Sequence, residues 1–245
     1  MVEVHFKHPD YKVKEFLDGW NSLKSIEREV IGDVKDKSLL HLMCQFGMDT
    51  LSWARLGASV TGVDISDNSI TRANELKKRA GLDDAVFIRC DILDLIGVIP
   101  EKFDVVFQSY GTHCWIVDIN RWAEVIAHHL KPGGIFYIID GHPILTIYLT
   151  ESMTYLDKKP ERYSNERDYC DFDYIVEKER VEWQHPLSSI INAIIKAGLV
   201  IEQVDEYDKG YYNQEKDWYR DGDYWYPPGG PTRYPLMFSL KARKP

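Results

Sequence analysis

The sequence predicts an α/β protein with a doubly wound, mostly parallel sheet, and three observations predict it. Short apolar stretches alternate with amphipathic helical stretches from residue 38 to residue 140. The apolar stretches are almost continuously hydrophobic, which is typical of parallel strands covered by helices on both faces. The last apolar stretch follows the one before it with no helix between them, so we expect the final strand to run antiparallel.

The elements follow from the hydrophobic pattern in chain order. Apolar residues recur at three- and four-residue steps from Asp10 to Val30, which predicts one helix within an N-terminal helical lead-in over residues 1–36. Strands are then expected at residues 38–44, 59–65, 85–90, 103–109 and 134–140, with helices at 49–56, 68–80 and 118–130.

The pattern changes after Asp140. Residues 141–183 form a polar, aromatic insert that we interpret as a cap between the fifth and sixth strands. A helix begins at Pro186 and ends before Gly198, the usual positions of these two terminators. The pattern ends with a sixth strand at 199–207, an aromatic loop at 207–233 and a seventh strand at 234–244, all within one domain over residues 1–245.

The composition narrows the classes of function. The net charge of -9 works against binding to nucleic-acid phosphates, which depends on Lys and Arg. No apolar run reaches the roughly 18 residues of a membrane span, and the charged N-terminus lacks the apolar core of a signal peptide. The four cysteines lie far apart without a CxxC pair, which favours neither a zinc site nor a disulfide framework. We therefore expect a cytoplasmic protein without membrane, nucleic-acid or metal partners.

Ligands of an open parallel sheet bind at the carboxyl ends of its strands. After the first strand, Gly47 has no Cβ and allows a ligand close to the backbone, while the helix that follows favours an anion at its start. After the second strand, Asp64 is placed to accept the hydroxyls of an adenosine ribose. The alternative for Gly47 is conformational, because turns at helix starts often use glycine.

The third and fourth strands end at further candidate residues. Asp91 is placed to accept from the exocyclic amine of adenine, with Ile65 and Ile92 packing against the ring. Asp64 and Asp91 each precede an expected helix, so each alone is equally well explained as an N-cap, but their joint spacing favours the ligand interpretation. Residues 108–115 would lie over the reactive end of the ligand.

The stretch "HLMCQFGMDTLSWARLGA", residues 41–58, carries a resemblance to a known family. Together with the two acids and the final antiparallel strand, it resembles the class I S-adenosylmethionine-dependent methyltransferases, whose Rossmann-like sheet has an antiparallel seventh strand. The usual first motif of that family is an acid followed by GxGxG. Here His41 stands at the acid, Met43 and Gln45 replace two glycines, and the stretch is similar to a subgroup with the motif HLxCxFGxDTLSxARxGA.

The resemblance implies S-adenosyl-L-methionine as the cofactor, with its ribose and adenine at the two acids. Gly47 holds the third glycine position, and the side chains of Gln45 and Ser109 would serve the polar groups of the cofactor. A neutral His41 cannot supply the negative charge that usually meets the ammonium of the cofactor. We therefore expect a residue of the first helix or of the loop after the fourth strand to supply it.

The implied reaction moves a methyl group from a sulfonium to a nucleophile in one in-line displacement. If the acceptor is a hydroxyl or an ammonium, a proton must leave, and His113, His142 and Tyr110 are the candidate catalytic residues by position, although packing also explains them. No Asn or Asp followed by Pro-Pro-Tyr/Phe stands after the fourth strand, where enzymes that methylate adenine or glutamine often place it. We therefore expect a small-molecule acceptor, bound by the insert and the aromatic loop.

Two alternatives remain. A nicotinamide-dependent oxidoreductase also uses an acid after the second strand, but the absence of GxGxxG and the final antiparallel strand count against it. A regulatory module that binds S-adenosylmethionine or S-adenosylhomocysteine without catalysis is compatible with the altered first motif.

Overall fold

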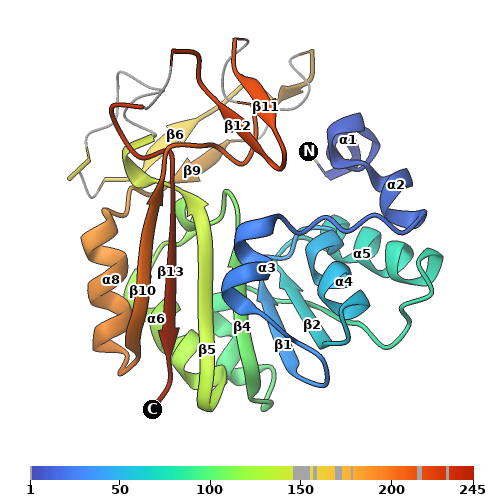
Figure 1. Cartoon of the computed structure of the whole chain (residues 1–245), viewed down its shortest axis with the longest axis vertical. Coiled ribbons are helices and arrows are strands. Elements are labelled where there is room, and N and C mark those ends of the chain that lie inside the picture. The colour runs from blue at the N-terminus through green and yellow to red at the C-terminus, as the bar shows by residue number, and fades with distance from the viewer. Residues whose placement is uncertain are drawn as a thin grey trace.

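Figure 1 shows the computed structural model, in which one twisted sheet carries helices on both faces and smaller strand pairs at one end. The structure describes residues 2–145, 155–156, 159–168, 173–177, 179–213, 217–229 and 232–245. Within them, the main sheet has seven strands in the order β10-β13-β5-β4-β1-β2-β3. They are β1 (Ser38–Leu42), β2 (Ser59–Asp64), β3 (Val86–Arg89), β4 (Phe103–Ser109), β5 (Leu130–Gly141), β10 (Val200–Tyr207) and β13 (Met237–Arg243).

The pairing directions confirm the predicted doubly wound sheet. From β3 through to β5 all neighbouring strands are parallel, whereas β13 is antiparallel to both β5 and β10. The chain runs outward from β1 through β2 to β3, then returns to the other side of β1 to form β4. The order of the strands therefore reverses between β1 and β4, and ligands of such sheets bind at the carboxyl ends beside that reversal.

Helices cover both faces of the sheet and bury a separate apolar cluster on each. One cluster lies under α6 (Ile119–His129) and α8 (Leu187–Lys196), and the other under α3 (Ser25–Ile31), α4 (Met48–Arg55) and α5 (Asp67–Arg79). Successive strand residues serve opposite clusters, because Leu39 packs on the α4 side, Leu40 packs on the α6 side, and both are fully buried. This alternation explains why the strands are hydrophobic at nearly every position.

The N-terminal lead-in differs from the single helix predicted between Asp10 and Val30. Lys12 and Gly19 have positive φ angles of 51° and 108°, which an α-helix does not allow, so the chain breaks there. Apolar residues such as Phe16 still reach the core, because short helical pieces satisfy the same spacing. The pieces before α3 are α1 (Val2–Lys7), a 3-10 turn (Pro9–Tyr11) and α2 (Val13–Leu17).

In the described part of the chain, three two-stranded sheets accompany the main sheet. Strands β6, β9, β11 and β12 lie at the end of the molecule toward which β5 points (Figure 1). The pairs are β6 (Glu161–Tyr163) with β9 (Arg180–Glu182), β7 (Glu166–Arg167) with β8 (Ile175–Val176), and β11 (Tyr219–Asp221) with β12 (Tyr224–Tyr226). The first two pairs belong to the predicted insert and the third to the aromatic loop. Outside the described residues lie 146–154, 157–158, 169–172 and 178 of the insert and 214–216 and 230–231 of the loop.

The described helices include none whose length and hydropathy would allow it to cross a membrane.

The start of α4 is held in place by close packing. Gly47, the residue before α4, has a φ of 79°, and a Cβ there would lie 2.5 Å from the ring of Phe87 and 3.2 Å from Cβ of Ala73. Glycine is therefore required at this position by the approach of α4 to its neighbours.

Replacing Gly47 by alanine is expected to lower the free energy of unfolding by about 2–4 kcal/mol, since the strained backbone and the displacement of Phe87 add together. Gly81→Ala is the matched control, because Gly81 has a φ of 67° and open space around it. Gly81→Ala should lower the free energy of unfolding by only about 1 kcal/mol. Urea denaturation measures both variants, and equal losses would contradict the packing argument.

Candidate functional site

An open cleft of about 1910 Å³ lies at the carboxyl ends of β1 to β5. Ligand pockets for small molecules usually measure about 300–1,000 Å³, so this cleft has room for two ligands. Its walls come from the loops after the strands, from the N-terminal lead-in, from the insert and from the aromatic loop. It brings together all the predicted site residues except Gly47: Gln45, Asp64, Ile65, Asp91, Ile92, Ser109, Tyr110, His113 and His142.

The loop after β1 keeps a glycine-like backbone without the usual glycines. Met43 and Gln45 have positive φ angles of 55° and 51°, which cost about 1–2 kcal/mol each for residues with a Cβ. Their side chains make contacts that glycine could not make. Met43 Sδ, for example, accepts a hydrogen bond from Gln108 Nε2 at 3.8 Å. Gly47 is not among the residues that line the cleft, and a Cβ there would meet Phe87, so this glycine has a packing role. Its close approach to a ligand stays a prediction.

Asp64 ties the first two loops together. Its Oδ2 accepts from the backbone N–H of Gln45 at 2.9 Å, and its Oδ1 accepts from the N–H of Ser66 at 2.9 Å. Ser66, not Asp64, caps α5, since its side chain accepts from the N–H of Ser69. Burial raises the pKa of Asp64 above its ordinary value. Each carboxylate oxygen has two lone pairs, so Asp64 retains acceptor capacity toward the cleft.

Asp91 serves as a helix cap and also borders the cleft. It precedes a 3-10 helix (Ile92–Gly97) and accepts from the N–H of Leu93 at 3.0 Å, so the capping interpretation applies to this acid. The isoleucines beside the two acids differ in exposure. Ile65 is 60% exposed at the cleft and Ile92 is only 7% exposed, so Ile65 is the one with surface available to an aromatic ring.

His41 is a neutral, buried member of β1. Its Nδ1 lies 2.8 Å from Thr50 Oγ1 and its Nε2 lies 3.4 Å from Ser109 Oγ. Burial lowers the pKa of His41 to about 4, although the nearby Asp49 acts in the opposite direction. The side chain is therefore uncharged near neutral pH, as the sequence indicated.

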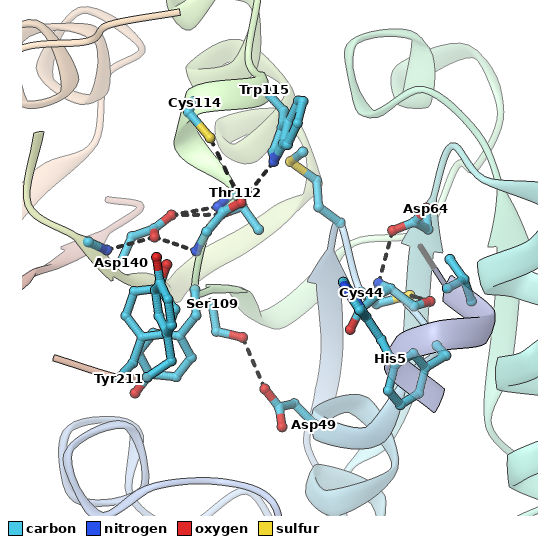
Figure 2. A pocket seen from close by; sticks show the side chains of 18 of the residues that line it. His5, Cys44, Asp49, Asp64, Ser109, Thr112, Cys114, Trp115, Asp140 and Tyr211 are labelled. Carbon is cyan, nitrogen blue, oxygen red and sulfur yellow. Dashed lines mark hydrogen bonds between the residues drawn. The ribbon is translucent and has the colours of Figure 1, made fainter. Parts of the chain in front are cut away.

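A negative charge stands beside His41 on the neighbouring helix. Asp49, in the first turn of α4, lines the cleft and accepts from Ser22 Oγ at 2.5 Å and from Ser109 Oγ at 3.2 Å (Figure 2). The sequence indicated only that the first helix or the loop after the fourth strand would supply such a charge. Asp49 lies on the first helix, the first of these alternatives, and an acid in the first turn of the expected helix was the available signal. Its role toward an ammonium stays a prediction.

Asp140, at the end of β5, organises the loop after β4. Figure 2 shows its carboxylate surrounded by that loop, and five donors reach it: the N–H groups of Gly111, Thr112, His113 and Gly141, and the hydroxyl of Thr112. Burial alone would raise the pKa of Asp140, but the adjacent His113 and the N–H donors hold the pKa at about 2. Asp140 is therefore ionised at neutral pH and fixes the loop. It was missed at the sequence level, where it appeared only as the last residue of a strand.

The three candidate catalytic side chains have different surroundings. Tyr110 donates its hydroxyl to the buried Glu27 at 2.8 Å, and burial raises its pKa well above the ordinary value, which disfavours it as a base. His142 Nε2 lies 2.8 Å from Glu206 Oε1, and burial lowers its pKa. His113 Nδ1 lies 3.1 Å from Asp140 Oδ2, so its Nε2 is the nitrogen left for a ligand in the cleft.

The N-terminal lead-in and the insert meet over the loop after β1. His5 Nε2 lies 3.0 and 2.9 Å from the two carboxylate oxygens of Asp168, and both residues are 2% exposed. On its other side, His5 Nδ1 lies 3.0 Å from Gln45 Nε2 and 3.1 Å from the hydroxyl of Tyr11. No local pattern indicated this contact, because His5 and Asp168 are 163 positions apart.

Residues 40–138 match a family model described as a methyltransferase domain. Over these residues the chain is similar to methyltransferase domains. The matched region runs from β1 into β5 and therefore includes the loops that carry Asp64 and Asp91, whereas the insert and the aromatic loop lie beyond it.

Proteins similar to this chain have different names. A solved S-adenosylmethionine-dependent methyltransferase from Mesorhizobium loti is 22% identical, with a TM-score of 0.60 over 93% of this chain and 100% of that one. An uncharacterized RNA methyltransferase of Caldanaerobacter subterraneus is 27% identical over 161 residues, which are 65% of this chain and 31% of the relative. A ubiquinone biosynthesis O-methyltransferase of Brucella anthropi is 29% identical over 110 residues, which are 45% of this chain and 43% of the relative. The chain spans less than half the length of these two curated relatives.

Replacing Asp140 by asparagine is expected to lower the free energy of unfolding at pH 7 by about 2–4 kcal/mol, because a neutral amide cannot serve five donors. The folded pKa of about 2 lies below the ordinary value of 3.8, so the contribution of the carboxylate is present above about pH 4 and is lost as the pH falls toward 2. Urea denaturation at pH 7 and pH 3 measures the difference between wild type and variant. A difference that does not shrink at the lower pH would contradict the assignment.

Proposed function

We propose that the chain transfers a methyl group from S-adenosylmethionine to a small-molecule acceptor. One observation carries the proposal: the same cleft is lined by Asp64 and Asp91 and by His113. The two acids suit an adenosine, and His113 offers a nitrogen that can accept a proton. We further infer that the chain belongs to the subgroup with the altered first motif, which the positive φ angles of Met43 and Gln45 support.

The cofactor end of the cleft fits an adenosine in chemical terms. Asp64 has lone pairs for the two ribose hydroxyls, Asp91 accepts from the adenine amine, and the exposed Ile65 packs against the ring together with Ile92. The N–H groups at the start of α4 and the side-chain amide of Gln45 suit a carboxylate. Asp49 then receives the ammonium group, with Ser109 between it and the neutral His41.

The acceptor end supplies alignment and a base. S-adenosylmethionine supplies a methyl group on a positively charged sulfonium. Holding the acceptor in line with that methyl group can lower the barrier by about 7–11 kcal/mol. His113 accepts, at its Nε2, the proton that the acceptor loses. Asp140 contacts Nδ1 of His113, so the ring keeps its orientation. Tyr110 and His142 border the same space, where they position the acceptor.

The charge of the cleft favours a small molecule over a nucleic acid. Among the residues that line it, eleven are Asp or Glu and four are Lys or Arg. Binding to a phosphate backbone depends on Lys and Arg, so this wall repels RNA even though one relative is named an RNA methyltransferase. The insert and the aromatic loop act as a cap that shapes the acceptor pocket.

Calorimetry with S-adenosylhomocysteine tests the cofactor assignment. Wild type is expected to bind it and to ignore NADH, while Asp64→Ala should lower the affinity at least about tenfold, the loss of hydrogen bonds to a charged group. Asp67→Ala is the matched control, because Asp67 is exposed on α5 and outside the cleft. Binding of NADH alone, or an unchanged affinity in Asp64→Ala, would refute the assignment.

The role of His113 is tested by transfer of a labelled methyl group to a mixture of small metabolites. His113→Ala should lower kcat about 100-fold or more without changing the affinity for S-adenosylhomocysteine, since a general base contributes about that much. His128→Ala, at the far end of α6, should leave both unchanged. Binding without any transfer by the wild type would favour the regulatory module over the enzyme.

A further inference from the structure

We propose that the acceptor is a cationic amine, recognised by carboxylates of the insert and by the aromatic rings that line the same part of the cleft. The inference rests on the proposed function and names the class of acceptor. It comes from the part of the cleft where the insert and the aromatic loop, which lie outside the matched residues 40–138, meet the loop after β4.

Acidic side chains outnumber basic ones in this part of the wall. Arg180, on β9, pairs with both Glu166 and Glu182, so one guanidinium is shared by two carboxylates and a negative charge is left over. The insert and the aromatic loop contribute Glu166, Glu177, Glu182, Asp217 and Asp223 to the wall, against Arg180 and Arg220. A cation entering this space is therefore attracted, and an anion is repelled.

Aromatic rings line the same cleft as these carboxylates. Tyr211 stacks on Tyr110 with ring centroids 4.8 Å apart, and Trp115 is held by a hydrogen bond from its Nε1 to the carbonyl of Gly111 at 2.9 Å. Rings nearby already carry cations, since Arg180 lies 4.9 Å from the centroid of Tyr163. Ring faces together with carboxylates form the combination that binds ammonium groups, whereas a neutral hydroxyl gains little from either.

The base stands where an ammonium would need it. His113 lines this part of the cleft, its side chain is 9% exposed, and Asp140 occupies its Nδ1. An ammonium has no lone pair, so it first gives a proton to His113 Nε2. The amine nitrogen then forms the new bond to the methyl carbon, the bond from that carbon to sulfur breaks, and sulfur keeps the electron pair. The proton on His113 passes to solvent.

Matched probes separate this acceptor class from others. Calorimetry on the protein saturated with S-adenosylhomocysteine compares phenethylamine and tyramine with their alcohols, 2-phenylethanol and tyrosol, and with 4-hydroxyphenylacetate. We expect at least one amine to bind tenfold or more tightly than its own alcohol, the carboxylate to bind least, and the preference for the amine to fall as salt is added.

Carboxylate variants place the recognition in the insert. Glu182→Gln should lower the affinity for the amine about tenfold. Glu177→Gln should lower it about two- to fivefold, and because Glu177 is exposed, its replacement does not affect folding. Neither variant should change the affinity for the alcohol. Glu179→Gln is the control, because Glu179 lies in the same insert, pairs with Arg162 and is outside the cleft.

The outcomes separate this inference from the proposed function. Failure to bind S-adenosylhomocysteine overturns the function itself. If S-adenosylhomocysteine binds but each alcohol binds as tightly as its amine, the function stands and the amine acceptor is overturned. Equal effects of Glu177→Gln, Glu182→Gln and Glu179→Gln on amine affinity also overturn it.

Discussion

The carboxylate of Asp140 is the constraint on which the cleft depends. Its five donors come from the loop after β4 and from its own strand, so the end of β5 dictates where that loop runs. Only an ionised carboxylate has acceptor sites for so many donors, which is why a buried charge is retained here. The strained Tyr110, with a φ of 33°, and the neighbouring His113 owe their positions to it.

The loop after β1, which the proposed function assigns to the cofactor, has a glycine-like backbone without the usual glycines. Positive φ angles at Met43 and Gln45 reproduce a glycine backbone at a cost in strain, which the contacts of their side chains with Gln108 and His5 offset. In the proposed function, Asp49 in the first turn of α4 supplies the negative charge, and β1 carries a neutral, hydrogen-bonded histidine.

Features that depend on neighbouring residues could be predicted from the sequence, whereas features that depend on contacts between distant segments could not. Strand β4 lies at the predicted residues 103–109, and the acids after β2 and β3 reach the cleft, because strand order and strand ends follow from local pattern. The predicted N-terminal helix was wrong, because apolar spacing does not reveal a left-handed residue such as Lys12. The donors around Asp140 and the pairing of His5 with Asp168 depend on contacts between distant segments, which no local pattern encodes.

The position of β13 has a consequence for the order of assembly during synthesis. In the main sheet β10 pairs only with β13, and β13 in turn is the strand that joins it to β5. A chain emerging from the ribosome therefore completes β10 before its partner exists, and one edge of the nascent sheet stays open at β5 until residues 237–243 arrive. During that interval β5 has an unpaired edge, and an open strand edge of this kind is prone to pair with another chain.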